Sequence, residues 1–200
     1  MNIYDLFMAP FENSGLKEMR MQLISKASGN CLELGVGSGA NLLYYDVYKV
    51  SHLIASDLDE TEKIESKIRE KLDLLLEKVP DGNVKVMQLN VENLPFEDNT
   101  FDTVVSTLIF CSVPDVLKGL SEIKRVLKPS GTFIFIEHVL SKSPIKAPVM
   151  NFLTPAWKTI ANGCHLNRDF ESALNQSGYS IKEHHFVISD VFYGGIASPS

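Results

Sequence analysis

Three glycines separated by single residues follow an apolar stretch in the segment CLELGVGSGANLLYY, residues 31–45. Glycines at this spacing let the backbone turn tightly and approach a ligand closely. Gly35, Gly37 and Gly39 form a G-x-G-x-G pattern, while Gly35, Gly37 and Ala40 match the pattern typical of dinucleotide sites. The spacing predicts a nucleotide-like ligand and leaves open whether it carries a pyrophosphate or a sulfonium.

Polar residues near the ends of neighbouring strands favour the sulfonium, which is S-adenosylmethionine (SAM). Glu33 places a carboxylate that suits the cationic amino-acid end of SAM, directly or through water, and that repels a pyrophosphate. Asp57 can accept hydrogen bonds from both hydroxyls of a ribose. Asn90 can reach the adenine amino group, and Leu58 and Val91 are available to sandwich the ring.

Hydrophobic periodicity and turn residues predict the elements that position these side chains. Strands are expected at 30–35, 52–56, 84–89, 101–107, 132–138, 179–189 and 191–197, and helices at 40–48, 60–79, 114–127 and 167–177. Alternation of this kind is typical of βαβ units around a parallel sheet. We therefore expect an α/β three-layer sandwich with a seven-stranded, mostly parallel sheet and one antiparallel strand near the C-terminus.

The composition excludes several classes of protein. With 200 residues, 44% of them hydrophobic, the chain suits a single domain. A net charge of −6 argues against a nucleic acid partner. Three widely spaced cysteines predict neither a disulfide framework nor a metal site. No signal peptide or membrane span is expected, so the predicted location is the cytoplasm, with peripheral membrane contact left open.

One segment, residues 141–166, is too long for a simple connection and is expected to cap the substrate. The other predicted parts of the domain are an N-terminal helical cap (1–29), a cofactor-binding core (30–140), and a C-terminal helix with strands (167–200). A monomer and a homodimer are both compatible with the sequence.

The order of these motifs resembles the class I, Rossmann-like SAM-dependent methyltransferases. LELGVGSGAN (32–41) resembles their first motif, ASDLD (55–59) their second, and LNVENLPFEDNTFDTVVS (89–106) the region between their third and fourth strands. The family usually has Asp-Ala where this chain has Asn90 and Val91. The resemblance implies SAM as cofactor and S-adenosylhomocysteine as its product.

Further contacts with the methionine end of SAM are expected from the resemblance. Thr107 and Leu108 end the fourth strand beside that end of the cofactor, and Tyr4 belongs to an N-terminal segment that closes over the cofactor in several relatives.

A narrower similarity concerns the small methyltransferase-like thiol methyltransferases. It rests on GANLLYY, LIFCSV, EIKRVLKPSG and PAWKTIANGCHLNRD. Those relatives carry a membrane-anchoring N-terminal segment that is not found in this sequence. The ubiquinone/menaquinone and phospholipid N-methyltransferases share the core motifs more loosely. The expected acceptor is a small molecule, and a thiol, an amine, a hydroxyl and a lipid-like or quinol compound all remain open.

Methyl transfer from a sulfonium is an in-line displacement, so the protein mainly has to align donor and acceptor. A thiol or hydroxyl acceptor must also lose its proton, which requires a base. His138, at the end of the fifth predicted strand, and His165, in the expected cap, are the candidates.

Two other functions share the same motifs. A nicotinamide-dependent oxidoreductase would use the glycines and Asp57, but Glu33 and the Asn90 region disfavour it. A non-catalytic SAM-binding protein would bind the cofactor without turnover.

Overall fold

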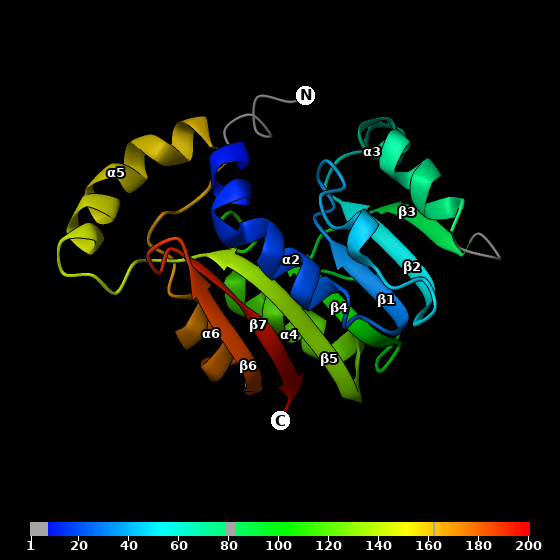
Figure 1. The fold of residues 1–200 in the computed structure, drawn as a ribbon. Coiled ribbons are helices and arrows are strands. Elements are labelled where there is room, and N and C mark those ends of the chain that lie inside the picture. Colours follow the sequence, from blue (N-terminus) through cyan, green and yellow to red (C-terminus); the bar gives the residue numbers. More distant parts are fainter. Residues whose placement is uncertain (1–7, 79–82, 162) are drawn as a thin grey trace.

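The computed structural model describes residues 8–78, 83–161 and 163–200. Its centre is a seven-stranded sheet in the order β3-β2-β1-β4-β5-β7-β6 (Figure 1). The strands are β1 (Gly29–Leu34), β2 (Val50–Asp57), β3 (Val84–Gln88), β4 (Phe101–Thr107), β5 (Leu127–His138), β6 (Tyr179–Val187) and β7 (Phe192–Pro199).

The pairing directions confirm the predicted sheet. Strands β1 to β5 pair in parallel, whereas β7 runs antiparallel to both of its neighbours, β5 and β6. Strand β6 therefore has the direction of the parallel strands, and β7 is the one antiparallel strand. Ile188, Ser189 and Asp190 all have positive φ, so they end β6 before the residue at which the sequence predicted its end.

Helices cover both faces of the sheet. They are α2 (Lys17–Ile24), α3 (Thr61–Leu76), α4 (Val116–Val126), α5 (Lys146–Ile160) and α6 (Phe170–Gln176), with a wide helical turn η1 (Glu12–Leu16) before α2. One buried cluster joins α2 and α3 to the sheet, through residues such as Leu23 and Ile68. The other joins α4 and α6 to the opposite face, through residues such as Ile123 and Phe170. The three predicted layers are confirmed.

The helix predicted at residues 40–48 is wrong. Only a short 3-10 turn, η2 (Leu42–Tyr44), forms there, because Tyr45 adopts an extended conformation with φ −64° and ψ 133°. The consequence for the site is large, since this turn directs the Tyr45 side chain back toward β1.

Several element boundaries differ from the sequence prediction by a few residues, and β5 differs most. Strand β5 begins at Leu127 rather than at residue 132, directly after α4, and its pairing with β4 is irregular before Thr132. Residues 141–166 contain α5, which stands apart from the sheet beyond the carboxyl end of β5 (Figure 1). Within the described ranges, no helix combines the length and apolar character needed to cross a bilayer.

Candidate cofactor and acceptor site

The three glycines of the loop after β1 all adopt left-handed backbone conformations, with φ of 70° at Gly35, 54° at Gly37 and 72° at Gly39. A Cβ on Gly35 would lie 2.1 Å from Cγ2 of Ile109, so this glycine is required for close packing. A Cβ on Gly37 would have only a backbone oxygen at 4.0 Å as a neighbour. Gly37 is thus the position at which the backbone is open to a ligand.

Asp57 ties the glycine loop to the carboxyl end of β2. Its Oδ2 accepts a hydrogen bond from the Gly37 amide at 2.9 Å, and its Oδ1 accepts one from the Leu58 amide at 2.8 Å. Each carboxylate oxygen retains a further lone pair, so Asp57 can still accept two ribose hydroxyls. The adjacent Leu58 side chain is 67% exposed and therefore free to cover a flat ring.

Glu33 is enclosed rather than open to solvent. Its Oε1 accepts a hydrogen bond from Asn41 Nδ2 at 2.9 Å and its Oε2 accepts one from the Tyr45 hydroxyl at 2.8 Å. Burial raises the pKa of Glu33, and these two hydrogen bonds and the charge of Arg20 oppose that shift. Both oxygens of Glu33 are thus engaged by side chains from the segment that follows the glycine loop.

A buried arginine from the N-terminal region completes this polar network. Arg20 of α2 donates from Nη1 to Asn41 Oδ1 at 2.8 Å and to Thr107 Oγ1 at 3.1 Å. Its Nε donates to Glu12 Oε1 at 3.0 Å. Asn41 Nδ2 also donates to Thr107 Oγ1 at 3.0 Å. The network links α2, the glycine loop and the end of β4 into one unit.

The loop after β4 is held by a second buried carboxylate, Glu137 of β5. It accepts hydrogen bonds from Ser106 Oγ at 3.0 Å, from the Phe110 amide at 3.0 Å and from the Ile109 amide at 3.3 Å. Burial raises the pKa of Glu137 to about 7, with these donors opposing the shift. Leu108, between β4 and this loop, has φ 59°, a strained value for a non-glycine residue and one that is frequent at functional sites.

The predicted adenine-binding residues differ in exposure. Asn90 is exposed, and its Oδ1 accepts a hydrogen bond from the Glu92 amide at 2.9 Å, which fixes the side-chain amide. Val91 is 8% exposed and packs in the cluster beneath α4. Leu58 is therefore better placed than Val91 to cover the ring with its side chain.

The two candidate histidines lie in different environments. His138 is largely buried, its Nδ1 finds no hydrogen-bond partner among the described residues, and burial lowers its pKa to about 4. His165 is half-buried, and its Nδ1 lies 3.1 Å from the Cys111 carbonyl oxygen. Because a carbonyl can only accept, Nδ1 donates to it, and in the neutral ring Nε2 carries the lone pair.

His165 also anchors the expected cap to the core. Its backbone amide donates to the same Cys111 carbonyl at 2.7 Å. The Cys111 thiol hydrogen-bonds that of Cys164, which lowers the pKa of Cys164 to about 7, helped by Trp157. The end of the 141–166 segment is thus joined to the loop that follows Leu108.

The structure brings one group of the predicted site residues together. The glycines, Asp57 and Leu58 form one set, and Glu33 and Thr107 join it through Asn41. Tyr4 lies outside the described residues. Across the part of the chain that is described, no cluster of three or more histidine, cysteine or acidic side chains could hold a metal ion.

Comparison with known proteins decides between the two ligands that the glycine spacing left open. The family model described as "Methyltransferase domain" matches residues 32–135, more than half of the chain. The chain belongs to this family. The methyltransferase domain and its fold imply SAM as the cofactor, so the resemblance to the class I enzymes is confirmed and the nicotinamide alternative is not supported.

Several named proteins are similar to this chain. It is 32% identical over 150 residues to the thiol S-methyltransferase TMT1B of Rattus norvegicus, a match that covers 74% of this chain and 59% of the relative. It is 34% identical over 126 residues to the ubiquinone/menaquinone biosynthesis C-methyltransferase UbiE of Rickettsia prowazekii. This match covers 60% of this chain and 49% of the relative. The chain therefore spans between about half and three fifths of the length of these curated relatives.

Solved structures support the same architecture. A SAM-dependent methyltransferase from Mesorhizobium loti superimposes with a TM-score of 0.69 at 18% identity, covering 92% of this chain and 97% of that one. At this identity the match establishes the fold of the methyltransferase domain.

The residues present fit SAM. Gly37 leaves the backbone open, Asp57 keeps hydrogen-bonding capacity where a ribose diol would lie, and Leu58 is exposed beside it. When bound, SAM supplies the activated methyl group. Asp57 would hold the ribose, and the Asn41 network would present its polar edge to the methionine end.

Sequence reasoning missed the residues that organise this candidate site, namely Arg20, Asn41, Tyr45 and Glu137. Asn41 directly follows the glycine loop, and Glu137 is an acid in an otherwise apolar strand, so both positions carried a signal. Arg20 and Tyr45 carried none, because their roles arise only when distant segments meet.

Proposed function

We propose that this protein transfers the methyl group of SAM to the sulfur of a small, mainly apolar thiol. The similarity to a thiol S-methyltransferase over 74% of the chain supports the acceptor class. The observation that carries the proposal is the contact between His165 Nδ1 and the Cys111 carbonyl, which leaves Nε2 of His165 able to accept a proton.

A base favours some acceptors over others. An amine is already nucleophilic when neutral, whereas a thiol or hydroxyl must lose its proton before or during transfer. A thiol ionises with a pKa of about 8.5, far below that of an aliphatic hydroxyl, so a single imidazole is sufficient for a thiol. His165 supplies that imidazole beside the loop that follows Leu108.

The second histidine has a different role in this proposal. Because burial lowers the pKa of His138 to about 4, its ring is neutral at physiological pH. The ring packs edge-on against Phe192, with 5.5 Å between the ring centroids, and its buried Nδ1 has no hydrogen-bond partner among the described residues. A neutral ring in these surroundings suits contact with an uncharged acceptor and is a weaker base than an ordinary histidine.

The experiment is an acceptor screen with purified protein, SAM, and an alkyl thiol, an aryl thiol, a primary amine, a phenol and a quinol. S-adenosylhomocysteine release and the mass of the methylated product are the two readouts. The proposal expects a thioether as the main product. A methylated amine or quinol with no thioether would overturn the thiol assignment, and SAM binding without turnover of any acceptor would overturn the enzymatic one.

A substitution tests the base separately. His165→Asn is expected to reduce kcat with an alkyl thiol about 10- to 100-fold, the lower part of the range for general base catalysis, because some thiolate is present without a base. With an aryl thiol, which ionises more readily, the reduction in kcat is expected to be smaller. Equal losses for the two thiols would show that His165 does not accept the proton.

A further inference from the structure

Helix α5 presents an apolar face to solvent. Four large apolar residues of α5 and its N-cap are exposed, Ile145 by 79%, Val149 by 53%, Phe152 by 83% and Leu153 by 47%. They are four of the eleven exposed large apolar residues in the described chain, and the other seven are scattered over several elements. A cluster of this kind marks a surface that contacts a partner or a lipid.

The spacing of these residues defines one stripe. Positions 145, 149, 152 and 153 follow the i, i+4, i+7, i+8 pattern of a single helix face. Of the residues whose burial in α5 is described, Thr154 alone is buried, and it lies on the other side of the helix. The apolar stripe of α5 therefore faces away from the core, the reverse of a packed surface helix.

We infer that α5 docks in the plane of a lipid bilayer that contains anionic lipids, with the stripe Ile145, Val149, Phe152 and Leu153 inserted among the acyl chains. A helix with one apolar face and flanking cations binds a membrane interface in this way. The docking does not depend on which acceptor is methylated.

The charges around the stripe match an anionic surface. Residues 141–160 hold Lys142, Lys146 and Lys158 and no acidic residue, although the whole chain has a net charge of −6. Lys146 lies three residues before Val149 on the border of the stripe. Its Nζ is 3.9 Å from Asp190, and Lys142 pairs with Glu171 at 2.8 Å, so these two charges are partly balanced. Lys158 is exposed on the side of the helix opposite the stripe, so Lys146 is the α5 lysine that lies beside the bilayer.

A second copy of the chain is a poorer occupant. A stable dimer covers roughly 800 Å² on each partner. Four partly exposed side chains of at most about 200 Å² each supply less than that area. Two copies of α5 face to face would also bring lysines together without intervening acids from the same helix. A bilayer requires only one helix face.

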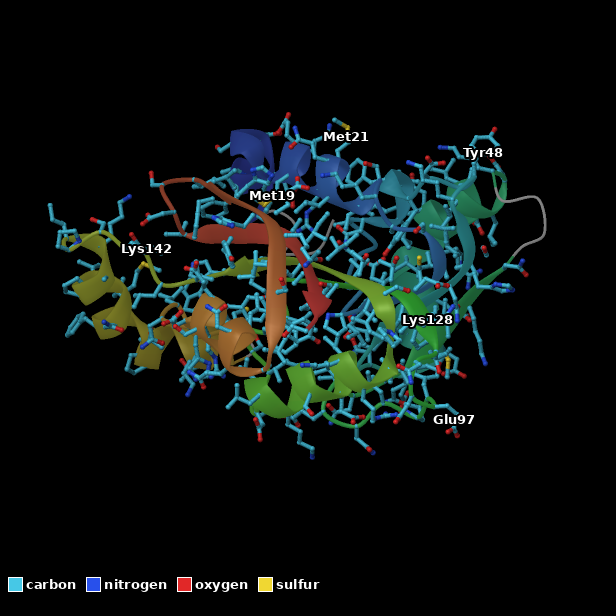
Figure 2. All side chains as sticks on the ribbon, turned by 90° about the horizontal axis from the view of Figure 1, so that it is seen from below. Met19, Met21, Tyr48, Glu97, Lys128 and Lys142 are labelled. Carbon is cyan, nitrogen blue, oxygen red and sulfur yellow. The ribbon has the colours of Figure 1, made fainter. Side chains whose placement is uncertain are left out.

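Docking would orient the acceptor side of the molecule. Helix α5 leads directly into Cys164 and His165, which contact Cys111 on the loop after β4. A docked α5 therefore holds this part of the molecule next to the bilayer. Figure 2 shows Lys142, at the start of the α5 segment, and Tyr48 at opposite ends of the molecule, so docking leaves the Tyr48 end in solvent.

The test is co-sedimentation of the whole protein with vesicles of phosphatidylcholine alone and of phosphatidylcholine mixed with phosphatidylglycerol. Binding is expected to the mixed vesicles and to weaken with added salt. Transfer of one large apolar side chain out of water is worth about 1.4 kcal/mol or more, which corresponds to a tenfold change in affinity. Phe152→Ser is therefore expected to lower vesicle affinity at least about tenfold. The matched control is Tyr48→Ser, which removes an aromatic ring that is 94% exposed, and it should bind as the unaltered protein does.

Two further readouts make the outcome decisive. The only tryptophan of the chain, Trp157, lies on α5, and its emission is expected to shift on addition of mixed vesicles and not to shift in Phe152→Ser. Both variants should keep the unaltered melting temperature, since both positions are exposed. Absence of vesicle binding, or equal binding by Phe152→Ser, would overturn the inference. A dimer by light scattering that Phe152→Ser converts to a monomer, with no vesicle binding, would assign the stripe to a second copy instead.

Discussion

The hydroxyl of Tyr45 donates a 2.8 Å hydrogen bond to Oε2 of the buried Glu33. Asn41 occupies the other oxygen of the same carboxylate at 2.9 Å. Both donors come from the segment directly after the glycine loop, whereas Glu33 precedes it. The conformation of the loop and the position of the carboxylate therefore stabilise each other.

Tyr45→Phe tests this relationship. Removing one donor leaves a buried carboxylate oxygen unsatisfied, which is expected to cost about 1–3 kcal/mol of unfolding free energy at neutral pH. Urea denaturation measures the change. Tyr44→Phe is the control, because the Tyr44 hydroxyl makes no hydrogen bond to any described residue. Equal destabilisation by the two substitutions would contradict a structural role for the Tyr45 hydroxyl.

Asp57→Ala is expected to weaken SAM binding by about 2–4 kcal/mol, because it removes two charge-assisted hydrogen bonds to the ribose. Isothermal titration calorimetry with SAM measures the loss. Asp59→Ala is a matched control two residues away, since Asp59 pairs with Lys63 and Lys67 on the surface. SAM affinity that is unchanged in Asp57→Ala would place the cofactor elsewhere, and stabilisation of the protein by NADH and not by SAM would contradict SAM as the cofactor.

Two glycine substitutions should have different effects. Both Gly35→Ala and Gly37→Ala place a side chain at positive φ, which costs about 1 kcal/mol. Gly35→Ala also brings Cβ to 2.1 Å from Ile109 Cγ2, an overlap expected to cost about 1–3 kcal/mol more.

Gly37→Ala meets no such obstacle and is expected to reduce SAM affinity more than stability. Thermal melts with and without SAM separate the two effects. If Gly37→Ala bound SAM normally, the loop backbone at residue 37 would not approach the cofactor.

Glu137 should make stability depend on pH. Its pKa is about 7 in the folded protein against 4.5 for an ordinary glutamate, so the folded state holds an extra proton between these values. Stability conferred by this proton is complete below pH 4.5 and is lost as pH rises to about 7, a loss of about 3 kcal/mol. Glu137→Gln is expected to remove this loss.

The neighbouring His138 acts in the opposite direction. Its pKa is lowered from 6.5 to about 4, so the unfolded state takes up a proton first and stability falls as pH falls through this range. The effect of Glu137→Gln on urea unfolding from pH 4 to pH 8 should therefore be measured twice, once with His138 present and once in the His138→Gln variant. A pH profile that Glu137→Gln leaves unchanged in both would contradict the assignment.

The sequence was sufficient wherever a local pattern determines the structure. The strands follow from short apolar runs, and α3 follows from the apolar spacing of Ile64, Ile68 and Leu75, all of which are buried. The glycine loop and Asp57 were found because their spacing reflects local backbone geometry. These patterns also predicted a mostly parallel sheet with one antiparallel strand.

The sequence was insufficient where contacts join distant segments. A helix was predicted at residues 40–48 because the run is apolar and aromatic, but Tyr45 takes an extended conformation that lets its hydroxyl reach Glu33. Arg20 reaches Thr107 across 87 positions of the chain. No periodicity signals such a contact, since it depends on how α2 packs on the sheet.

Transfer of a labelled methyl group tests the central claim most directly. The protein is incubated with SAM that carries a trideuterated methyl group and with an aryl thiol, and both products are quantified by mass spectrometry. Our account predicts one labelled thioether for each S-adenosylhomocysteine formed, and a strong loss of both in Asp57→Ala but not in Asp59→Ala. Binding of SAM with no labelled thioether above the level of a protein-free control would contradict it.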